Sequence, residues 1–396
     1  MVIRHRHGER SHADALRASV AAARALEAQG RRISRLDIGE PHFPTAPHII
    51  DAAHRAMRDG ATKYVSPQGL PELREAIASA QRARGLDAHA DEIVVTPGVK
   101  PMLMYALASV CHAGDELLVP DPGYPGYIAA ARLAGAHVRS YPITRTGDAF
   151  GIDLGQLHAT ITAATRVLVI NSPNNPTGMV LETRALEGIA ELARRHDLWV
   201  LSDEIYSALI YDQEPRRSIA TLAGMRERTI VVDGFSKAYA MTGWRLGYAV
   251  LPSRLVSPVT ALVADGSTCT PPFVQHAGIA ALTGPQNGVT EMRRAYRARR
   301  DSLVHQLNAI RGMHAVTPPG AFYAFADVSG LMTRNSILSS ADLATNLLHE
   351  YHVACVAGPA FGVRGEAHLR FSFAVSRDHL DDALRRLDAW GESLRS

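Results

Sequence analysis

Residues 229–248 have the sequence TIVVDGFSKAYAMTGWRLGY. The apolar, β-branched run 230–232 predicts a buried strand. A turn then leads to Ser236 and Lys237, and Arg245 follows in the same segment. A lysine directly after a buried strand can lose its hydration, which lowers its pKa and makes it a candidate for Schiff-base chemistry. Ser236 adds a hydroxyl beside it, and Arg245 adds a guanidinium group that suits phosphate.

The composition indicates a globular enzyme of two domains. The chain has 396 residues, of which 46% are hydrophobic and 20% charged. A net charge of +3 is too small to indicate a nucleic-acid partner. We find no continuous apolar stretch of the roughly 18 residues that a membrane span needs, and no secretory signal. Cys111, Cys269 and Cys355 are few and far apart, which indicates reduced thiols in a cytoplasmic protein and no zinc-type metal site.

Strand and helix patterns alternate along residues 92–250, which predicts a mainly parallel sheet with helices on both faces. Apolar runs indicate buried strands at 93–96, 117–119, 167–170, 199–202 and 230–232. Helices are expected at 12–30, 47–58, 182–195 and 286–311. We expect a large domain at 48–289 and a smaller α/β domain formed by 1–47 together with 290–396.

Polar and aromatic residues follow these strands, at the edge where open α/β sheets bind ligands. Gly98, Val99 and Lys100 join a strand to a helix N-terminus, which is a site for an anion. Tyr124 follows the next strand and can stack on a flat heterocycle, whereas the neighbouring Tyr127 is expected to pack.

Several motifs together resemble the class I/II aminotransferases, which carry pyridoxal phosphate on the fold called fold type I. A lone lysine after a strand would be interpreted as a surface residue, but here the Ser236-Lys237 pair is followed by Gly-Trp-Arg and Gly-Tyr. The Asn-Pro-Thr-Gly sequence at 175–178 and the segment from Tyr64 to Arg74 match the family as well. The resemblance is closest to the aspartate aminotransferase-like branch. It implies a seven-stranded-type sheet.

The resemblance also implies the cofactor site. Lys237 would form the Schiff base with pyridoxal phosphate and then move the substrate proton, and Asp203 would pair with the pyridine nitrogen. Asn175 and Tyr206 would bond the cofactor's phenolic oxygen. Tyr64 would reach the phosphate in the partner subunit, which implies a homodimer with shared active sites. The full set of cofactor-binding residues is then Tyr64, Gly98, Val99, Lys100, Tyr124, Asn175, Asp203, Tyr206, Ser236, Lys237 and Arg245.

For the substrate, the resemblance implies contacts with Gly39, Asn175 and Arg370. Arg370 would grip the α-carboxylate with two hydrogen bonds. In isolation Arg370 would be interpreted as a solvated strand residue, and the Gly-Glu-Pro sequence at 39–41 as an ordinary turn. The family often has an aspartate where this chain has His42, and some members have a serine where it has Gly234. These departures bear on the substrate.

The expected function is amino transfer between an amino acid and a 2-oxo acid by a ping-pong mechanism. A pyridoxal-phosphate lyase or cyclising enzyme on the same scaffold is the alternative. A non-catalytic regulator with an aminotransferase-like domain is a rival from another class. Lys100 could touch the distal carboxylate of a dicarboxylic substrate or only screen the phosphate. Trp244 and Phe43 could instead favour a bulkier, apolar donor.

Overall fold

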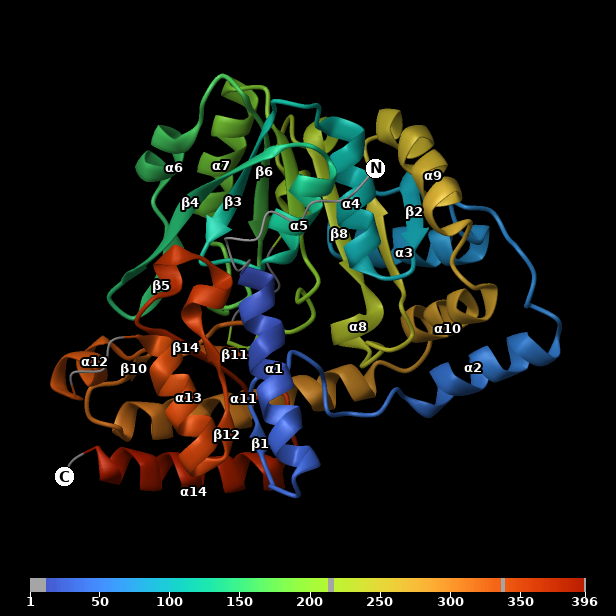
Figure 1. The fold of residues 1–396 in the computed structure, drawn as a ribbon. Helices are drawn as coiled ribbons and strands as arrows, with labels where there is room; N and C mark the ends of the chain where they lie inside the picture. Colours follow the sequence, from blue (N-terminus) through green and yellow to red (C-terminus); the bar gives the residue numbers. More distant parts are fainter. Residues whose placement is uncertain (1–11, 213–216, 336–338, 395–396) are drawn as a thin grey trace, which may run out of the picture.

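The larger sheet of the computed structural model has eight strands in the order β2-β9-β8-β7-β6-β3-β4-β5 (Figure 1). The structure describes residues 12–212, 217–335 and 339–394. Strands β8, β7, β6, β3 and β4 are mutually parallel, while β9 runs antiparallel between β8 and β2. In chain order the strands are β2 Ile93–Thr96, β3 Glu116–Asp121, β4 His137–Thr146, β5 Ala149–Ile152, β6 Thr165–Asn171, β7 Trp199–Asp203, β8 Thr229–Gly234 and β9 Gly247–Val250.

The predicted mainly parallel α/β sheet is confirmed, with additional strands. The apolar runs expected to form strands lie within β2, β3, β6, β7 and β8. Strands β4 and β9 were not among the expected runs, and neither was the edge strand β5. Strand β5 forms a hairpin with the end of β4 and makes eight strands where the resemblance implied a seven-stranded type. Gly147, with φ of +60°, allows the tight turn between them.

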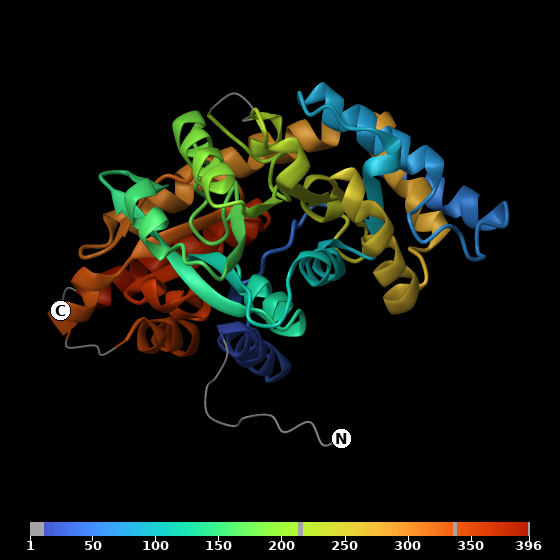
Figure 2. The same ribbon diagram turned by 90° about the horizontal axis from the view of Figure 1, so that it is seen from above.

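Helices cover both faces of this sheet, because each buried strand has apolar side chains on both sides. Val94 and Val232 face α4 Val99–Val110, α5 Gly126–Leu133 and α9 Ser253–Ser267. Their neighbours Val95 and Val231 face α2 Pro47–Arg58, α3 Pro71–Ala83 and α10 Pro272–Thr283. On that second face, α6 Leu154–Thr160 and α7 Thr183–Arg195 cover β3, β6 and β7 (Figure 2).

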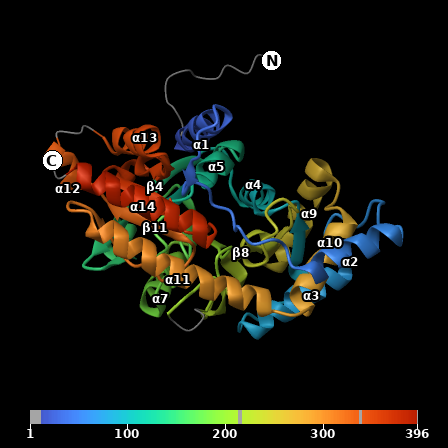
Figure 3. The ribbon, with the colours of Figure 1, turned by 90° about the horizontal axis from the view of Figure 1, so that it is seen from below.

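A smaller antiparallel sheet of order β10-β11-β14-β13 lies below the large one in Figure 1. Its strands are β10 His314–Ala315, β11 Tyr323–Asp327, β13 Val356–Ala357 and β14 His368–Ser372, and β1 Ser34–Arg35 pairs in parallel with β12 Val353–Ala354. Figure 3 shows the accompanying helices from below. They are α1 His12–Ala28, α11 Asn287–Ala309, α12 Ser329–Asn335, α13 Ser340–Tyr351 and α14 Arg377–Ser393.

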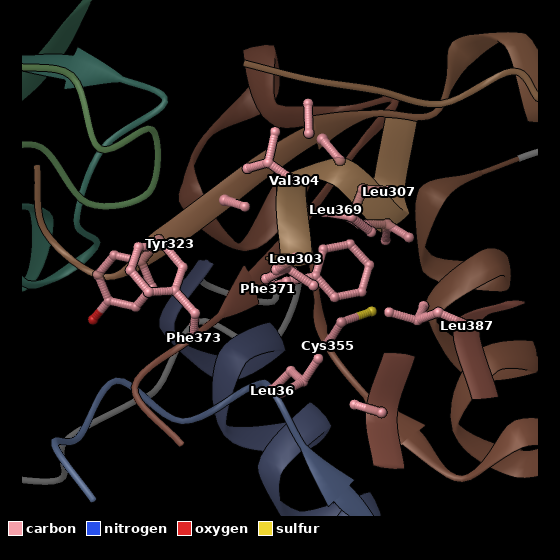
Figure 4. Close-up of a cluster of buried hydrophobic side chains, with 14 of the residues drawn as sticks. Leu36, Leu303, Val304, Leu307, Tyr323, Cys355, Leu369, Phe371, Phe373 and Leu387 are labelled. Carbon is pink, nitrogen blue, oxygen red and sulfur yellow. The ribbon is translucent and has the colours of Figure 1, made fainter. Parts of the chain in front are cut away.

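Strands β10, β11 and β14 share one hydrophobic core with helices α11, α12, α13 and α14 (Figure 4). Leu303 and Leu307 of α11 and Leu387 of α14 pack against Leu369 and Phe371 of β14. Because side chains alternate along a strand, β14 turns its intervening residue to the opposite face, toward the larger sheet. Short elements complete the fold, namely α8 Phe235–Ala238, η1 Ala90–Glu92, η2 Ile219–Thr221, η3 Arg226–Arg228, η4 Gly358–Phe361 and η5 Val363–Gly365.

Candidate active site

A cavity of about 620 Å³ lies at the carboxyl ends of the parallel strands. Asn171 ends β6, Asp203 ends β7 and Ser236 follows β8, and all three line it. Tyr323 and Arg370, from β11 and β14 of the smaller sheet, line it as well. The cavity therefore lies between the two sheets, where strand ends bring distant parts of the sequence together.

Lys237 is held in the short helix α8, directly after β8. Its Nζ donates a hydrogen bond of 2.6 Å to the carbonyl oxygen of Gly39. Burial, opposed by the charge of Glu40 and assisted by the positive charge of Arg370, lowers the pKa of Lys237 to about 8. The amine therefore reaches its neutral, nucleophilic form much nearer to neutral pH than a free lysine does.

Asp203 is 4% exposed and has no ion-pair partner among the described residues. Its Oδ2 accepts a 2.7 Å hydrogen bond from the hydroxyl of Tyr127, and its Oδ1 accepts one from the amide of Ile205. Burial raises the pKa of Asp203 to about 6, while these two hydrogen bonds lower it. Tyr127 packs in the core as expected, and its hydroxyl in addition bonds this candidate catalytic carboxylate.

The predicted anion site forms where the turn after β2 meets the segment before β9. Gly98 has φ of +88°, and a Cβ on it would overlap the guanidinium of Arg245. A Cβ on Gly247 would lie 2.6 Å from the amide nitrogen of Val99. These glycines let the start of α4, Arg245 and the buried Ser236 approach one another. A helix N-terminus beside a guanidinium group is suited to phosphate.

Arg370 is 2% exposed, so the solvated-strand interpretation was wrong. Its Nη1 donates to Asn175 Oδ1 at 3.0 Å and its Nη2 to the carbonyl oxygen of Asp37 at 2.6 Å. Its Nε is buried without a hydrogen-bond partner among the described residues. The nearby carboxylate of Asp37 is already bound by both Nε and Nη2 of Arg35. A buried guanidinium with a free donor is suited to a carboxylate from outside the protein.

Tyr323 is a second residue that the sequence reasoning missed. Its hydroxyl lies 2.8 Å from that of Tyr206, and the Arg370 guanidinium stacks 4.3 Å from its ring. A Cβ on Gly39 would overlap the Tyr323 hydroxyl, which is fixed by burial and by Tyr206. Gly39 is therefore a position of close approach rather than an ordinary turn, and its contact with substrate stays a prediction.

Most of the predicted site residues meet in this cavity, with Gly98 just behind its wall. The structure also brings in Glu40 and Thr242, which hydrogen-bond each other. Tyr64 is 85% exposed and lies outside the lining. The lining residues predicted from sequence are Gly39, Val99, Lys100, Tyr124, Asn175, Asp203, Tyr206, Ser236, Lys237, Arg245 and Arg370.

The structure shows what surrounds Gly234 and His42, the two positions that depart from the family pattern. A Cβ at Gly234 would lie 3.0 Å from Gly247 Cα and from the carbonyl oxygen of Leu246, so a serine there would crowd the backbone at the start of β9. His42 lies 3.1 Å from Arg299 through its Nδ1, and burial lowers the pKa of this histidine to about 4. His42 is therefore a neutral partner for Arg299, outside the cavity lining.

A family model described as aminotransferase class I and II matches residues 31–387. The chain belongs to this family. This aminotransferase is 39% identical to an aspartate aminotransferase of Musicola paradisiaca, over 92% of each chain. It is equally similar, at 39%, to an aromatic-amino-acid aminotransferase of Thermococcus litoralis, with 90% of this chain and 91% of the relative covered. The Thermus thermophilus aspartate aminotransferase with maleate has a TM-score of 0.89 and 38% identity, over 95% and 96% of the two chains.

The aminotransferase depends on pyridoxal phosphate, and its cavity fits that cofactor. Asp203 is a buried carboxylate without an ion-pair partner among the described residues. The protonated pyridine nitrogen of the cofactor would supply that partner. Lys237 is a desolvated amine, and Gly98 opens the anion site that the phosphate requires. Tyr124 lies at the wall, edge-to-face with Tyr127 at 5.4 Å between ring centroids, where it can contact a flat ring.

Two features are absent from the part of the chain that the structure describes. No group of three or more His, Cys, Asp or Glu side chains is placed there to hold a metal ion. None of the helices there is both long and apolar enough to cross a membrane.

Proposed function

We propose that this aminotransferase acts on dicarboxylic substrates, such as glutamate, aspartate or 2-oxoglutarate, in at least one half-reaction. The observation that carries the proposal is the position of Lys100, which lines the same cavity as Arg370 and has no ion-pair partner among the described residues. Arg370 would take the α-carboxylate, and Lys100 would then be available for a distal one. Trp244 and Phe43 are not among the described residues that line the cavity, so these two side chains give no support to a bulky, apolar donor.

The names of the relatives support both choices of substrate. Relatives named as aspartate aminotransferases support an acidic substrate, and so does the Thermus structure with maleate, a dicarboxylate. The aromatic-amino-acid relative supports the other choice. The lining residues of this chain therefore carry the argument.

The proposed mechanism assigns each polar group a task. Arg370 and Asn175 orient the substrate by its α-carboxylate. Lys237 Nζ takes the proton from the substrate Cα and holds it for return, which suits an amine whose pKa is about 8. When bound, pyridoxal phosphate supplies the electron sink for the Cα carbanion. The carboxylate of Asp203 would pair with the cofactor's ring nitrogen, and Tyr127 holds that carboxylate in place.

We also propose the division into a large domain at 48–289 and a small domain of 1–47 and 290–396. The separate hydrophobic cores support it, since the core around β14 draws mainly on residues after 290 and on Leu36. The boundaries fall within the first turns of α2 and α11. The cytoplasm is the proposed compartment, and three free cysteines, two of them buried, support it. A homodimer with shared sites is proposed from Tyr64.

The test of substrate choice is a single-turnover screen with amino acids, following the absorbance of the bound cofactor. We expect glutamate and aspartate to react faster than alanine or arginine. We expect the Lys100→Ala variant to lose that preference by about ten-fold, the effect of one charge-assisted hydrogen bond. An unchanged ranking in the variant, or no preference in the wild type, would refute the proposal.

A further inference from the structure

Helix α1 lines one side of the cavity with three residues at regular helical spacing. Leu16, Val20 and Arg24 are four residues apart and therefore lie along one face of the helix. Ala23 lies at the edge of this face and packs with Leu348 and Ala354 of the smaller domain. Helix α1 is thus fixed to the smaller domain on one side and presents a stripe of two apolar residues and one cation to the cavity.

Arg24 is the cation of this stripe, and its guanidinium has no partner among the residues that the structure describes. It forms no hydrogen bond or ion pair with any residue in the described ranges. The acids that line the cavity have other partners. Asp37 is bound by Arg35, Glu40 by Thr242, and Asp203 by Tyr127.

The cations of the cavity exceed what one phosphate and one α-carboxylate require. Arg245 lies at the phosphate site, Arg370 at the α-carboxylate site, and Lys237 carries the chemistry. Lys100 and Arg24 remain, one from α4 and one from α1. Unpaired cations around a partly enclosed cavity favour an anionic ligand, because the low-dielectric walls strengthen the attraction.

We propose that Arg24 is a specificity-determining residue that pairs with the distal carboxylate of the substrate, in addition to Lys100. This inference rests on the proposed function and assigns α1 a part in it. The guanidinium can bind a carboxylate through two parallel hydrogen bonds, which a lysine cannot. Leu16 and Val20 offer apolar contact to the methylene groups between the two carboxylates. The stripe therefore matches a short chain that ends in an anion.

The test compares binding of succinate and butyrate, a dicarboxylate and a monocarboxylate of equal chain length, to the holoenzyme by calorimetry. Neither ligand has an amino group, so binding is measured without turnover. Arg24→Gln should weaken succinate roughly two- to five-fold relative to butyrate, as expected for loss of one charge pair at an exposed side chain. Arg24→Lys should recover part of the loss. Arg17→Gln is the matched control, because Arg17 is on the same helix, pairs with Asp14 and does not line this cavity.

The outcomes separate this inference from the proposed function. A selective loss of succinate binding in Arg24→Gln supports the inference. Equal succinate binding in Arg24→Gln and wild type would overturn it, and so would an equal loss in Arg17→Gln, which would indicate only a general charge effect. Thermal unfolding of each variant confirms that α1 is intact. If Lys100→Ala keeps the wild-type ranking in the turnover screen while Arg24→Gln loses succinate, the assignment of Lys100 fails and that of Arg24 stands.

Discussion

Lys237 shows how a single residue combines a cost in stability with a gain in reactivity. The lysines of this chain are Lys63, Lys100 and Lys237, and Lys63 is exposed. The pKa of Lys237 is lowered to about 8, mainly by burial. A charged amine is thus disfavoured in the folded protein, and the neutral amine that the chemistry needs becomes accessible.

Replacing Lys237 with methionine should stabilise the cofactor-free protein. Because the folded-state pKa is about 8 and the unfolded value 10.5, the unfolded chain binds more protons between these values, and stability rises with pH through that window. Below pH 8 the full penalty, on the order of 3 kcal/mol, opposes folding. Lys237→Met should therefore raise the free energy of unfolding in urea at pH 7 by part of that amount, since the bond to Gly39 is lost. The gain should shrink as pH approaches 10.5.

Lys63→Met is the matched control, since it removes an exposed lysine and should change stability little. An equal effect of the two substitutions would contradict the buried, neutral amine. So would a gain that grows with rising pH.

At the same scale, the sequence predicted the residues that follow strands and missed those that depend on distant contacts. Lys237, Asp203 and Arg245 each follow or flank a recognisable apolar run. Tyr127 bonds a carboxylate 76 residues away, and no local pattern shows which of two nearby tyrosines does so. Tyr323 is fixed by Tyr206 across 117 residues. The first contact depends on how α5 packs on the larger sheet, and the second on how the two sheets meet. Local patterns encode neither.

At the scale of elements, the junction of β2, α4 and β9 decides where an anion can bind. The helix N-terminus would be blocked by side chains at its own cap and on the neighbouring strand. Gly98 and Gly247 keep it open to Arg245. The buried strands themselves were predictable because they are short apolar runs bounded by turns. Strand β5 was not, because it is a partly exposed edge strand without such a run.

Gly98→Ala should weaken retention of pyridoxal phosphate by about ten-fold or more, since the new methyl group would displace the Arg245 guanidinium from the start of α4. Equilibrium dialysis of the cofactor measures this effect. Gly85→Ala is the control, with φ of +87° against +88° and open space around its Cβ. Both variants carry backbone strain of about 1–3 kcal/mol. Equal cofactor loss in both would show that strain, rather than the contact, is responsible.

At the scale of the whole molecule, the cavity is built from two sheets with separate cores. The larger sheet supplies Asp203 and Lys237, and the smaller one supplies Tyr323 and Arg370. Every one of these residues comes from the same chain. Tyr64 differs from the other predicted residues, because its side chain is 85% exposed and is not part of the described lining. If Tyr64 has a role in a cofactor site, that site belongs to another copy of the chain.

Shared sites predict complementation between two defective subunits. In a dimer of Lys237→Ala and Tyr64→Phe chains, one site combines the intact Lys237 of one subunit with the intact Tyr64 of the other, while the second site lacks both. Co-expression with two affinity tags isolates this mixed dimer, which should have about half of the wild-type activity, since one of two symmetric sites is intact. A dimer of Tyr64→Phe with a chain carrying both substitutions is the control, because no intact site can form in it. Mixed-dimer activity at or below half that of the Tyr64→Phe homodimer would mean that each site is complete within one chain, as would full activity of a monomer in light scattering.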